Sequence, residues 1–338
     1  MVQFLDVPAV VRLVSRIGPV PFLAGLVDYL ESDFRRWESF EKSARLASHS
    51  SVGVIELMPT ADETLYAFKY VNGHPANAAL GKLTVTGLGV LASVETGYPL
   101  LVSEMTVCTA LRTAATSALA AKHLARPESA TMALIGLGAQ AEFQTLAFMA
   151  ATQVRTIRAF DINPAALAKF ERNMLARGMT IVATNSVDEA VDGADIVTTA
   201  TAAKKRAAVL HTSQVQAGMH INAIGGDCPG KTELELGVLT RAKVFVEFEP
   251  QSRIEGEVQQ VPADFAVTEL WQVITGRAPG RTHAHDVTLF DSVGFAIEDF
   301  SMLRYLHDIV QRDGGAEVID VVPALRDTTN LFGLFTGT

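Results

Sequence analysis

The chain has 338 residues, a length that predicts two domains or one large domain with an appendage. Its composition, 49% hydrophobic and 19% charged with ordinary numbers of Gly and Pro, excludes a disordered or collagen-like protein. Asp and Glu outnumber Lys and Arg, and the net charge of −9 without a basic run disfavours binding to nucleic acid or to an anionic membrane.

Cysteine content and hydropathy indicate the compartment. Two cysteines, Cys108 and Cys228, are too few for a disulfide scaffold or a cysteine-based metal site. The N-terminus lacks the basic and apolar segments of a signal peptide. The longest stretch without Asp, Glu, Lys or Arg, Ala207–Gly226, contains His, Gln and Asn side chains, which do not suit a membrane span. We therefore expect a soluble, cytoplasmic protein.

The first hundred residues mix helical and strand-like patterns. Helices are predicted over Val7–Arg16 and Pro21–Phe40, and strands over Ser51–Met58, Tyr66–Val71 and Pro99–Ser103. No internal repeat or low-complexity linker interrupts this part of the chain.

From residue 131 onward, short β-rich runs alternate regularly with helical stretches, which predicts a parallel sheet with helices on both faces. The predicted strands are Thr131–Ile135, Thr156–Phe160, Thr180–Ala183, Ile196–Ala200, His220–Ile224 and Val244–Phe248. The predicted helices are Ala139–Ala151, Pro164–Arg177 and a short one opened by Ser186, with Glu189 completing a capping box. A long helix is expected from Ser292 to about Arg312, after which the chain should return to the N-terminal region.

A glycine-rich turn follows the first of these strands. In Gly136-Leu-Gly138-Ala-Gln-Ala141, the first glycine permits a tight turn and the second lets the backbone approach a pyrophosphate. Asp161 ends the next strand, where a carboxylate hydrogen-bonds the ribose and would repel a 2′-phosphate. The pattern predicts a dinucleotide site for NAD rather than NADP. Alternatively, Asp161 caps the helix that begins at Asn163-Pro164.

Charged residues in unusual surroundings are candidates for the chemistry. Asp227 follows a strand and two glycines, a position at which ligands bind in doubly wound folds, although Asp beside Gly and Pro more often starts a turn. Arg112 is the only charge between Met105 and Ala121, so a buried guanidinium facing phosphate or carboxylate competes with a surface arginine.

Three further charged residues can also be interpreted as ordinary solvent-exposed residues. Glu56 and Lys69 lie in apolar runs and could be the solvent-facing members of alternating strands, and Arg45 could lie on a solvated helix. The eight histidines show no metal-ligand spacing, so no metal is expected. A serine-hydrolase elbow, G-x-S-x-G, does not occur.

Five runs are more specific: Arg45-Leu-Ala-Ser-His-Ser, Gly53-Val-Ile-Glu-Leu-Met-Pro, Phe68-Lys-Tyr-Val-Asn-Gly-His-Pro, Leu111-Arg-Thr-Ala-Ala-Thr-Ser and Gly225-Gly-Asp-Cys-Pro-Gly-Lys-Thr-Glu-Leu. They resemble the ornithine cyclodeaminase and mu-crystallin family, and the resemblance covers nearly the whole chain. The Asp-Cys-Pro-Gly-Lys-Thr-Glu segment is the most specific part, because the broader family varies there.

The resemblance implies an α/β fold in which a Rossmann-type NAD domain joins a discontinuous α+β substrate and dimerisation domain, assembled as a homodimer. On this chain the expected boundaries are 1–118 for the N-terminal part of the substrate domain, 119–305 for the NAD domain and 306–338 for the C-terminal return.

The resemblance also implies roles for individual residues. Arg45, Lys69 and Arg112 would hold the substrate α-carboxylate, Asp227 would be the catalytic acid/base, and Glu56 would stand beside the reacting carbon. Val293 would contact the substrate near the nicotinamide. The residues that would line NAD, in addition to Gly136 and Gly138 of the glycine turn, are Thr84, Arg112, Ala139, Gln140, Asp161, Thr201 and Lys231.

The chemistry that the family implies is a closed redox cycle on L-ornithine. NAD would take a hydride from Cα, the δ-amine would attack that carbon, ammonia would leave, and the returned hydride would give L-proline. The alternatives are a related amino-acid dehydrogenase or ketimine reductase with net NADH turnover, and a non-enzymatic binding protein that keeps the NAD fold.

Overall fold

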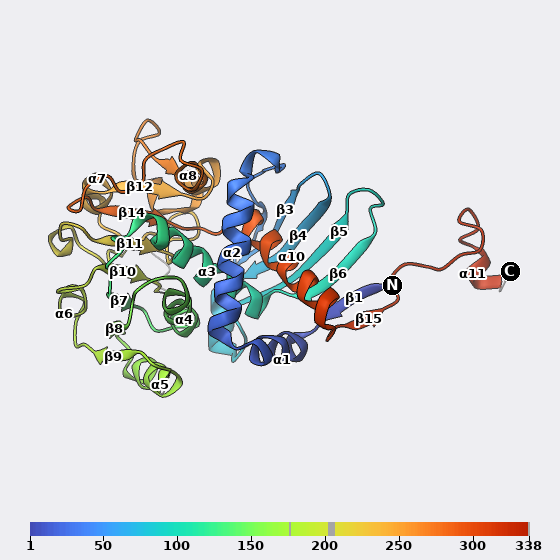
Figure 1. Ribbon diagram of the computed structural model, residues 1–338, viewed down its shortest axis with the longest axis horizontal. Coiled ribbons are helices and arrows are strands. Elements are labelled where there is room, and N and C mark those ends of the chain that lie inside the picture. Colours follow the sequence, from blue (N-terminus) through green and yellow to red (C-terminus); the bar gives the residue numbers. More distant parts are fainter. Residues whose placement is uncertain (176, 202–206, 337–338) are drawn as a thin grey trace.

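The computed structural model describes residues 1–175, 177–201 and 207–336, which form two sheets side by side with helices between them (Figure 1). The first sheet has the order β15-β1-β6-β5-β4-β3-β2, and its neighbours are antiparallel except for the parallel pair β1 and β6. Its strands are β1 (Val2–Leu5), β2 (Leu46–His49), β3 (Val54–Ala61), β4 (Leu65–Gly73), β5 (Val85–Ser93), β6 (Pro99–Glu104) and β15 (Glu317–Ile319).

The second sheet is parallel throughout, as the alternation of strands and helices predicted, and its order is β13-β12-β14-β11-β10-β7-β8-β9. The strand order reverses beside β7, the place where doubly wound sheets bind ligands. The strands are β7 (Thr131–Ile135), β8 (Thr156–Phe160), β9 (Thr180–Ala183), β10 (Ile196–Thr199), β11 (His220–Ala223), β12 (Lys243–Val246), β13 (Thr268–Glu269) and β14 (Thr288–Asp291).

Helices pack between and around the two sheets. They are α1 (Val7–Ile17), α2 (Pro19–Arg35), α3 (Thr106–Leu124), α4 (Ala141–Ala151), α5 (Pro164–Met174), α6 (Val187–Val191), α7 (Leu236–Arg241), α8 (Glu249–Glu255), α9 (Leu270–Ile274), α10 (Ala296–Asp313) and α11 (Gly333–Thr336). One hydrophobic core runs from α2 through α3 and α10 to α4. Among the described residues no single helix is long and apolar enough to cross a membrane; α1 and α2 together are, but they are bent by 99°.

Helix α10 covers the inner face of the first sheet. It packs against α2 and against β3 to β6, and a Cβ atom on Gly89 would lie 3.1 Å from the Leu303 side chain, so glycine permits this close approach. We therefore propose that the return to the first unit begins near Ala296 rather than at the expected boundary of 306.

The structure differs from the expected elements at several helix ends. The helix expected over Pro21–Phe40 ends at Arg35 and continues only as a short 3₁₀ turn, Trp37–Ser39. The long C-terminal helix begins at Ala296 instead of Ser292, because Gly294 adopts φ +77° in a loop before it. At the C-terminus β15 pairs with β1, as expected, but residues beyond it leave the N-terminal region.

Candidate active site

The glycine turn joins β7 to α4 at the carboxyl edge of the parallel sheet. Gly136 has φ +94°, and a Cβ atom there would lie 2.6 Å from the Ala200 carbonyl oxygen, so only glycine fits. A Cβ atom on Gly138 would meet nothing within 4 Å among the described residues, so its backbone borders open space. Ala139 and Gln140 complete the turn, and α4 begins directly after it without a side-chain cap, which suits an anion at its N-terminus.

Asp161 lies against this turn. Its carboxylate accepts hydrogen bonds from Leu137 N at 2.7 Å and from Asn163 N at 2.8 Å. The cap of α5 is Asn163, whose side chain accepts from Ala165 N, so the alternative that Asp161 caps this helix is wrong. The carboxylate is therefore held beside the glycine turn, as a ribose contact requires.

Asp227 lies in the loop after β11, and its side chain is 54% exposed. Lys231 Nζ lies 3.0 Å from its carboxylate. Burial lowers the pKa of Lys231, but the charge and hydrogen bond of Asp227, together with the charges of Glu233 and Cys228, raise that pKa above its ordinary value. Gln259 fixes the conformation of this loop, because its side-chain amide accepts from Gly230 N and donates to the carbonyls of Cys228 and Lys231.

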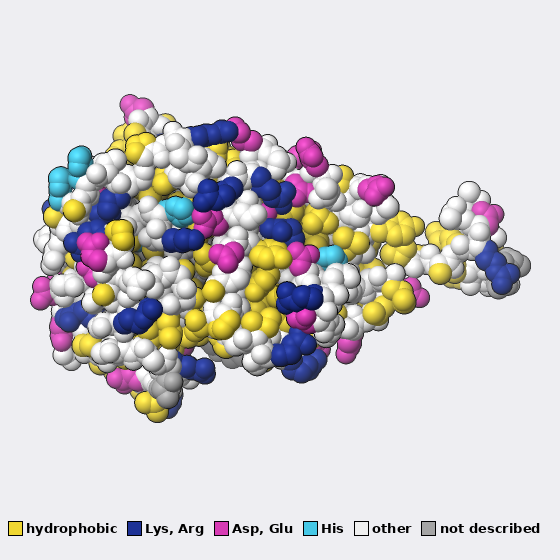
Figure 2. All heavy atoms as spheres, in the orientation of Figure 1, with side chains coloured by type: hydrophobic (Ala, Val, Ile, Leu, Met, Phe, Trp, Pro, Cys, Tyr) yellow, Lys and Arg dark blue, Asp and Glu magenta, His cyan; other side chains and the backbone are white. Residues whose placement is uncertain are grey.

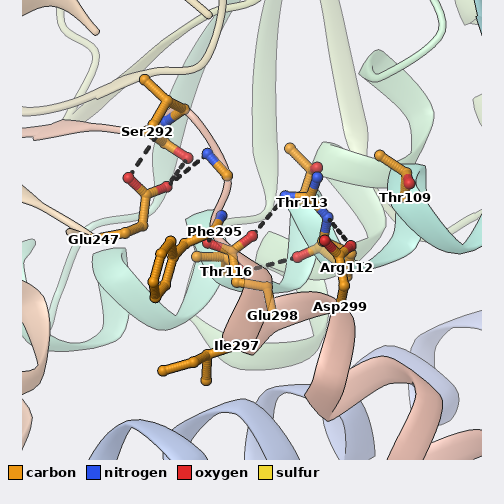
Figure 3. Close-up of polar contacts among 12 residues, drawn as sticks. Thr109, Arg112, Thr113, Thr116, Glu247, Ser292, Phe295, Ile297, Glu298 and Asp299 are labelled. Carbon is orange, nitrogen blue, oxygen red and sulfur yellow. Dashed lines mark hydrogen bonds and ion pairs between the residues drawn. The ribbon is translucent and has the colours of Figure 1, made fainter. Parts of the chain in front are cut away.

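Arg112 and Lys69 lie in a buried charge cluster between α3, β4 and α10. Figure 3 shows Arg112 facing Glu298 and Asp299. Arg112 contacts Glu298 at 2.5 Å and Asp299 at 3.1 Å, and Lys69 contacts Asp299 at 2.9 Å. Burial, together with the charge of Arg112, lowers the pKa of Lys69 to about 8. Burial raises the pKa of Glu298 to about 7 although Arg112 opposes it. The buried guanidinium facing carboxylates is confirmed, and the solvent-facing alternative for Lys69 is wrong.

Arg45 forms a second group of contacts, just before β2 and not on a helix. Its guanidinium lies 3.0 Å from Glu56 and 3.1 Å from Glu255, and it donates to the carbonyls of Val293 and Gly294. Glu56 is buried, so its solvent-facing alternative is also wrong. Burial raises the pKa of Glu255 to about 7; Arg45 opposes this shift, and the negative charges of Glu56 and Asp227 add to it. Asp227 therefore lies within electrostatic reach of the Arg45 group.

The loop before α10 connects the two groups. Glu247 accepts hydrogen bonds from Ser292 Oγ at 2.6 Å and from Gly294 N at 3.1 Å (Figure 3). A Cβ atom on Gly294 would lie 2.4 Å from Arg112 Nη1, so glycine lets the loop touch the guanidinium. Val293, whose carbonyl accepts from Arg45, directly precedes this glycine; the substrate contact expected at Val293 stays a prediction.

Two residues expected to contact the cofactor, Thr201 and Thr84, differ in burial. Thr201 donates from its backbone N (2.9 Å) and from its hydroxyl to buried Glu233, whose pKa is raised by burial. Thr84 lies in an exposed turn before β5, where its carbonyl accepts from His74 N. Thr201 thus borders the glycine turn through Ala200, whereas the role of Thr84 stays a prediction.

Sequence reasoning missed five buried carboxylates of the site: Glu233, Glu247, Glu255, Glu298 and Asp299. The adjacent acids Glu298 and Asp299 interrupt the apolar run from Phe295 to Met302, which was an available signal. Glu247 likewise interrupts the apolar run from Val244 to Phe248, whereas Glu233 and Glu255 lie in mixed segments, where a carboxylate is ordinarily solvated.

Together these features define a two-unit α/β protein with a dinucleotide-binding edge beside a buried charge cluster. Residues 8–314 match the model of the Ornithine cyclodeaminase/mu-crystallin family, and the chain belongs to this family.

Similar proteins include a curated enzyme and two solved structures. The ornithine cyclodeaminase of Brucella suis biovar 1 (strain 1330) is 56% identical over 334 residues, 99% of this chain and 93% of that protein. A structure of lysine cyclodeaminase, described for its recognition of L-lysine, L-ornithine and L-2,4-diamino butyric acid, has a TM-score of 0.89 at 31% identity, covering 98% of this chain and 99% of that one. An archaeal alanine dehydrogenase dimer with bound NAD has a TM-score of 0.86 at 29% identity, covering 95% and 99%.

Proposed function

We propose that this chain converts L-ornithine to L-proline and ammonia, with NAD as a catalytic cofactor. The observation that carries the proposal is the position of Asp227, at the carboxyl edge of the parallel sheet and within electrostatic reach of the buried Arg45 group. The identity of 56% to the Brucella ornithine cyclodeaminase supports the reaction, and the similarity to NAD-bound and ornithine-recognising relatives supports the ligands.

The substrate carboxylate binds beside Val293, between the cations Arg45, Lys69 and Arg112. These cations already face the carboxylates of Glu56, Glu255, Glu298 and Asp299. Because the pKa values of Glu255 and Glu298 are about 7, both groups take up protons readily at neutral pH. Protonation of these two groups reduces the negative charge that faces the three cations, which favours binding of the substrate carboxylate.

The residues that hold NAD surround the glycine turn. The open side of Gly138, the first amides of α4 and the oriented carboxylate of Asp161 fit a pyrophosphate and a ribose. When bound, NAD supplies a hydride acceptor and later a hydride donor for the substrate Cα. The residues proposed to hold it are Thr84, Arg112, Gly136, Gly138, Ala139, Gln140, Asp161, Thr201 and Lys231.

Asp227 acts as the general acid/base. Its exposed carboxylate, which lies 3.0 Å from Lys231 Nζ, binds the δ-ammonium group of ornithine and accepts its proton. The resulting amine attacks the oxidised Cα, the ring closes, and the α-amino group leaves as ammonia. Glu56 stands beside the reacting carbon, held by Arg45.

The outer face of the first sheet supports a homodimer. Leu46, Leu57, Tyr70 and Leu88 pair across β2, β3, β4 and β5, and each is between 37% and 63% exposed. A row of exposed apolar side chains on the sheet face opposite the covering helix is typical of a protein–protein interface. A second copy covers this face. We also propose a cytoplasmic location, which the low cysteine content supports.

Product analysis tests the reaction. With L-ornithine in large excess over NAD, we expect proline and ammonia in equal amounts and no net NADH, because the hydride returns to its own carbon. NADH formed in proportion to a keto acid would overturn the proposal and favour an amino-acid dehydrogenase, the activity named for the archaeal structural neighbour.

A further inference from the structure

The last described segment, Asp320–Thr336, stands apart from both sheets; we call it the C-terminal arm. It begins directly after edge strand β15 and projects away from the body, with α11 near its end (Figure 1). Hydrogen bonds give it a local fold, since Asp327 accepts from Thr329 and Asn330 accepts from Gly333 N. The match to the family model ends at residue 314, before the arm begins.

The tip of the arm is apolar and exposed. Leu331, Phe332, Leu334 and Phe335 are 58%, 72%, 54% and 84% exposed, and the two phenylalanine rings lie 5.9 Å apart. In the space-filling view the arm is joined to the body only by a narrow neck (Figure 2). Terminal segments with a fold of their own are ordinarily tied down by contacts, and clustered exposed apolar side chains mark an interaction site.

Three observations favour a second copy of this chain as the occupant. The arm starts at the edge of the same sheet whose outer face carries the exposed row Leu46, Leu57, Tyr70 and Leu88. Asp320–Arg326, the part of the arm before its hydrogen-bonded tip, can span roughly 23 Å when extended, which exceeds the roughly 10 Å between two packed sheets. Val318 and Val321, exposed where the arm departs, continue the apolar surface from the sheet edge toward the tip.

We propose that the arms are exchanged in the homodimer: each copy inserts Leu331, Phe332, Leu334 and Phe335 into the surface of the other. The proposal rests on the homodimer proposed above and adds to it a second contact, separate from the sheet face. Exchange buries the apolar tip against the other subunit. It also gives fixed contacts to a segment that projects away from the body of its own chain.

The first test is a dilution series of the full chain, followed by analytical ultracentrifugation. The double variant Phe332→Asp/Phe335→Asp should raise the dimer dissociation constant by about tenfold or more, because buried aromatic anchors dominate interfaces. Leu175→Asp, at a similarly exposed leucine far from the arm, serves as the matched control and should leave the constant unchanged. Far-ultraviolet circular dichroism checks that both variants fold.

The second test locates the arm. A photoreactive amino acid at position 332 is introduced into a mixture of ¹⁴N- and ¹⁵N-labelled copies, and cross-linked peptides are identified by mass. Peptides that join light and heavy copies are expected. Arm exchange alone is overturned if a dimer forms but its cross-links stay within one copy. The same holds if the double variant leaves the dimer dissociation constant unchanged. A chain that is monomeric at every concentration overturns the homodimer as well.

Discussion

The dinucleotide edge and the buried charge cluster adjoin each other but are built in opposite ways. The edge consists of backbone from contiguous segments, and Gly136, Gly138 and Asp161 all lie within 26 residues of one another. The cluster consists of side chains that lie far apart in the chain, such as Arg112 and Glu298. A backbone site depends on local conformation, whereas a cluster of buried charges depends on every member being present, because each unpaired charge is costly.

Asp227 follows β11 at the carboxyl edge of the parallel sheet, and the largest effect is expected there. Asp227→Asn keeps the shape of the side chain but loses the proton acceptor, so turnover should fall by about 10² to 10⁴. The melting temperature with NAD should stay near that of the wild type, because the residue is exposed. Asp264→Asn, at another exposed loop, is the control and should retain full turnover. Turnover within threefold of wild type would remove Asp227 from the mechanism.

The charge cluster can be broken at Asp299, which contacts both Lys69 and Arg112. Asp299→Asn leaves two buried cations short of a partner and should lower the free energy of unfolding by about 3–5 kcal/mol. Asp308→Asn on the exposed side of the same helix should change it by less than about 0.5 kcal/mol. Urea titration measures both. Equal effects would mean that the cluster is not interdependent and that the contrast between the regions does not hold.

The dinucleotide edge is tested at Asp161. Removing a charged acceptor from the ribose should weaken NAD binding about tenfold in Asp161→Ser and leave NADP binding unchanged or improved. Asp192→Ser, an exposed residue of the same unit, provides the comparison. Isothermal titration calorimetry gives both dissociation constants. If Asp161→Ser weakens the binding of NAD and of NADP equally, the role of Asp161 is to hold the glycine turn, where it accepts from Leu137 N, and not to contact the ribose.

The smallest effect expected is a slope of stability against pH. Burial raises the pKa of Glu255 and Glu257 to about 7 and that of Asp291 to about 8. A carboxyl group with a raised folded-state pKa holds its proton when the unfolded chain has lost it. Its stabilisation is therefore complete below the unfolded pKa and disappears as the pH rises through the folded value. Calorimetry should show a melting temperature that falls between pH 5 and pH 8.

Asp291→Asn sharpens this measurement, because it removes the group with the highest of these pKa values. The variant should show a shallower fall than the wild type over the same range, whatever its absolute stability. Lys69, with a pKa of about 8, contributes in the opposite direction only above that pH. A melting temperature that rises from pH 5 to pH 8 would mean that these carboxylates are ionised in the folded protein.

Predictability followed how clearly turn signals bound each element in the sequence. Strands β7, β8 and β9 have the predicted bounds, because each appears in the sequence as a short run of β-forming residues between turn signals. The short strands β1, β2, β13, β14 and β15 were not anticipated, since their pairing is with distant segments. Strand β5 was missed for another reason: Gly87 and Gly89 weaken its strand pattern but admit Met105 and α10.

The sequence by itself determined the local parts of this protein: the alternating strands and helices, the glycine turn with Asp161, and the placement of Asp227 after a strand end. These features depend on neighbours within one turn or one strand, so their residue pattern is sufficient. Only the tertiary structure decided that Glu56, Lys69 and Arg112 are buried, and which carboxylates face them. A lone charge has the same local pattern whether it is solvated or paired across 186 residues, as Arg112 and Glu298 are, because burial is a property of the folded whole.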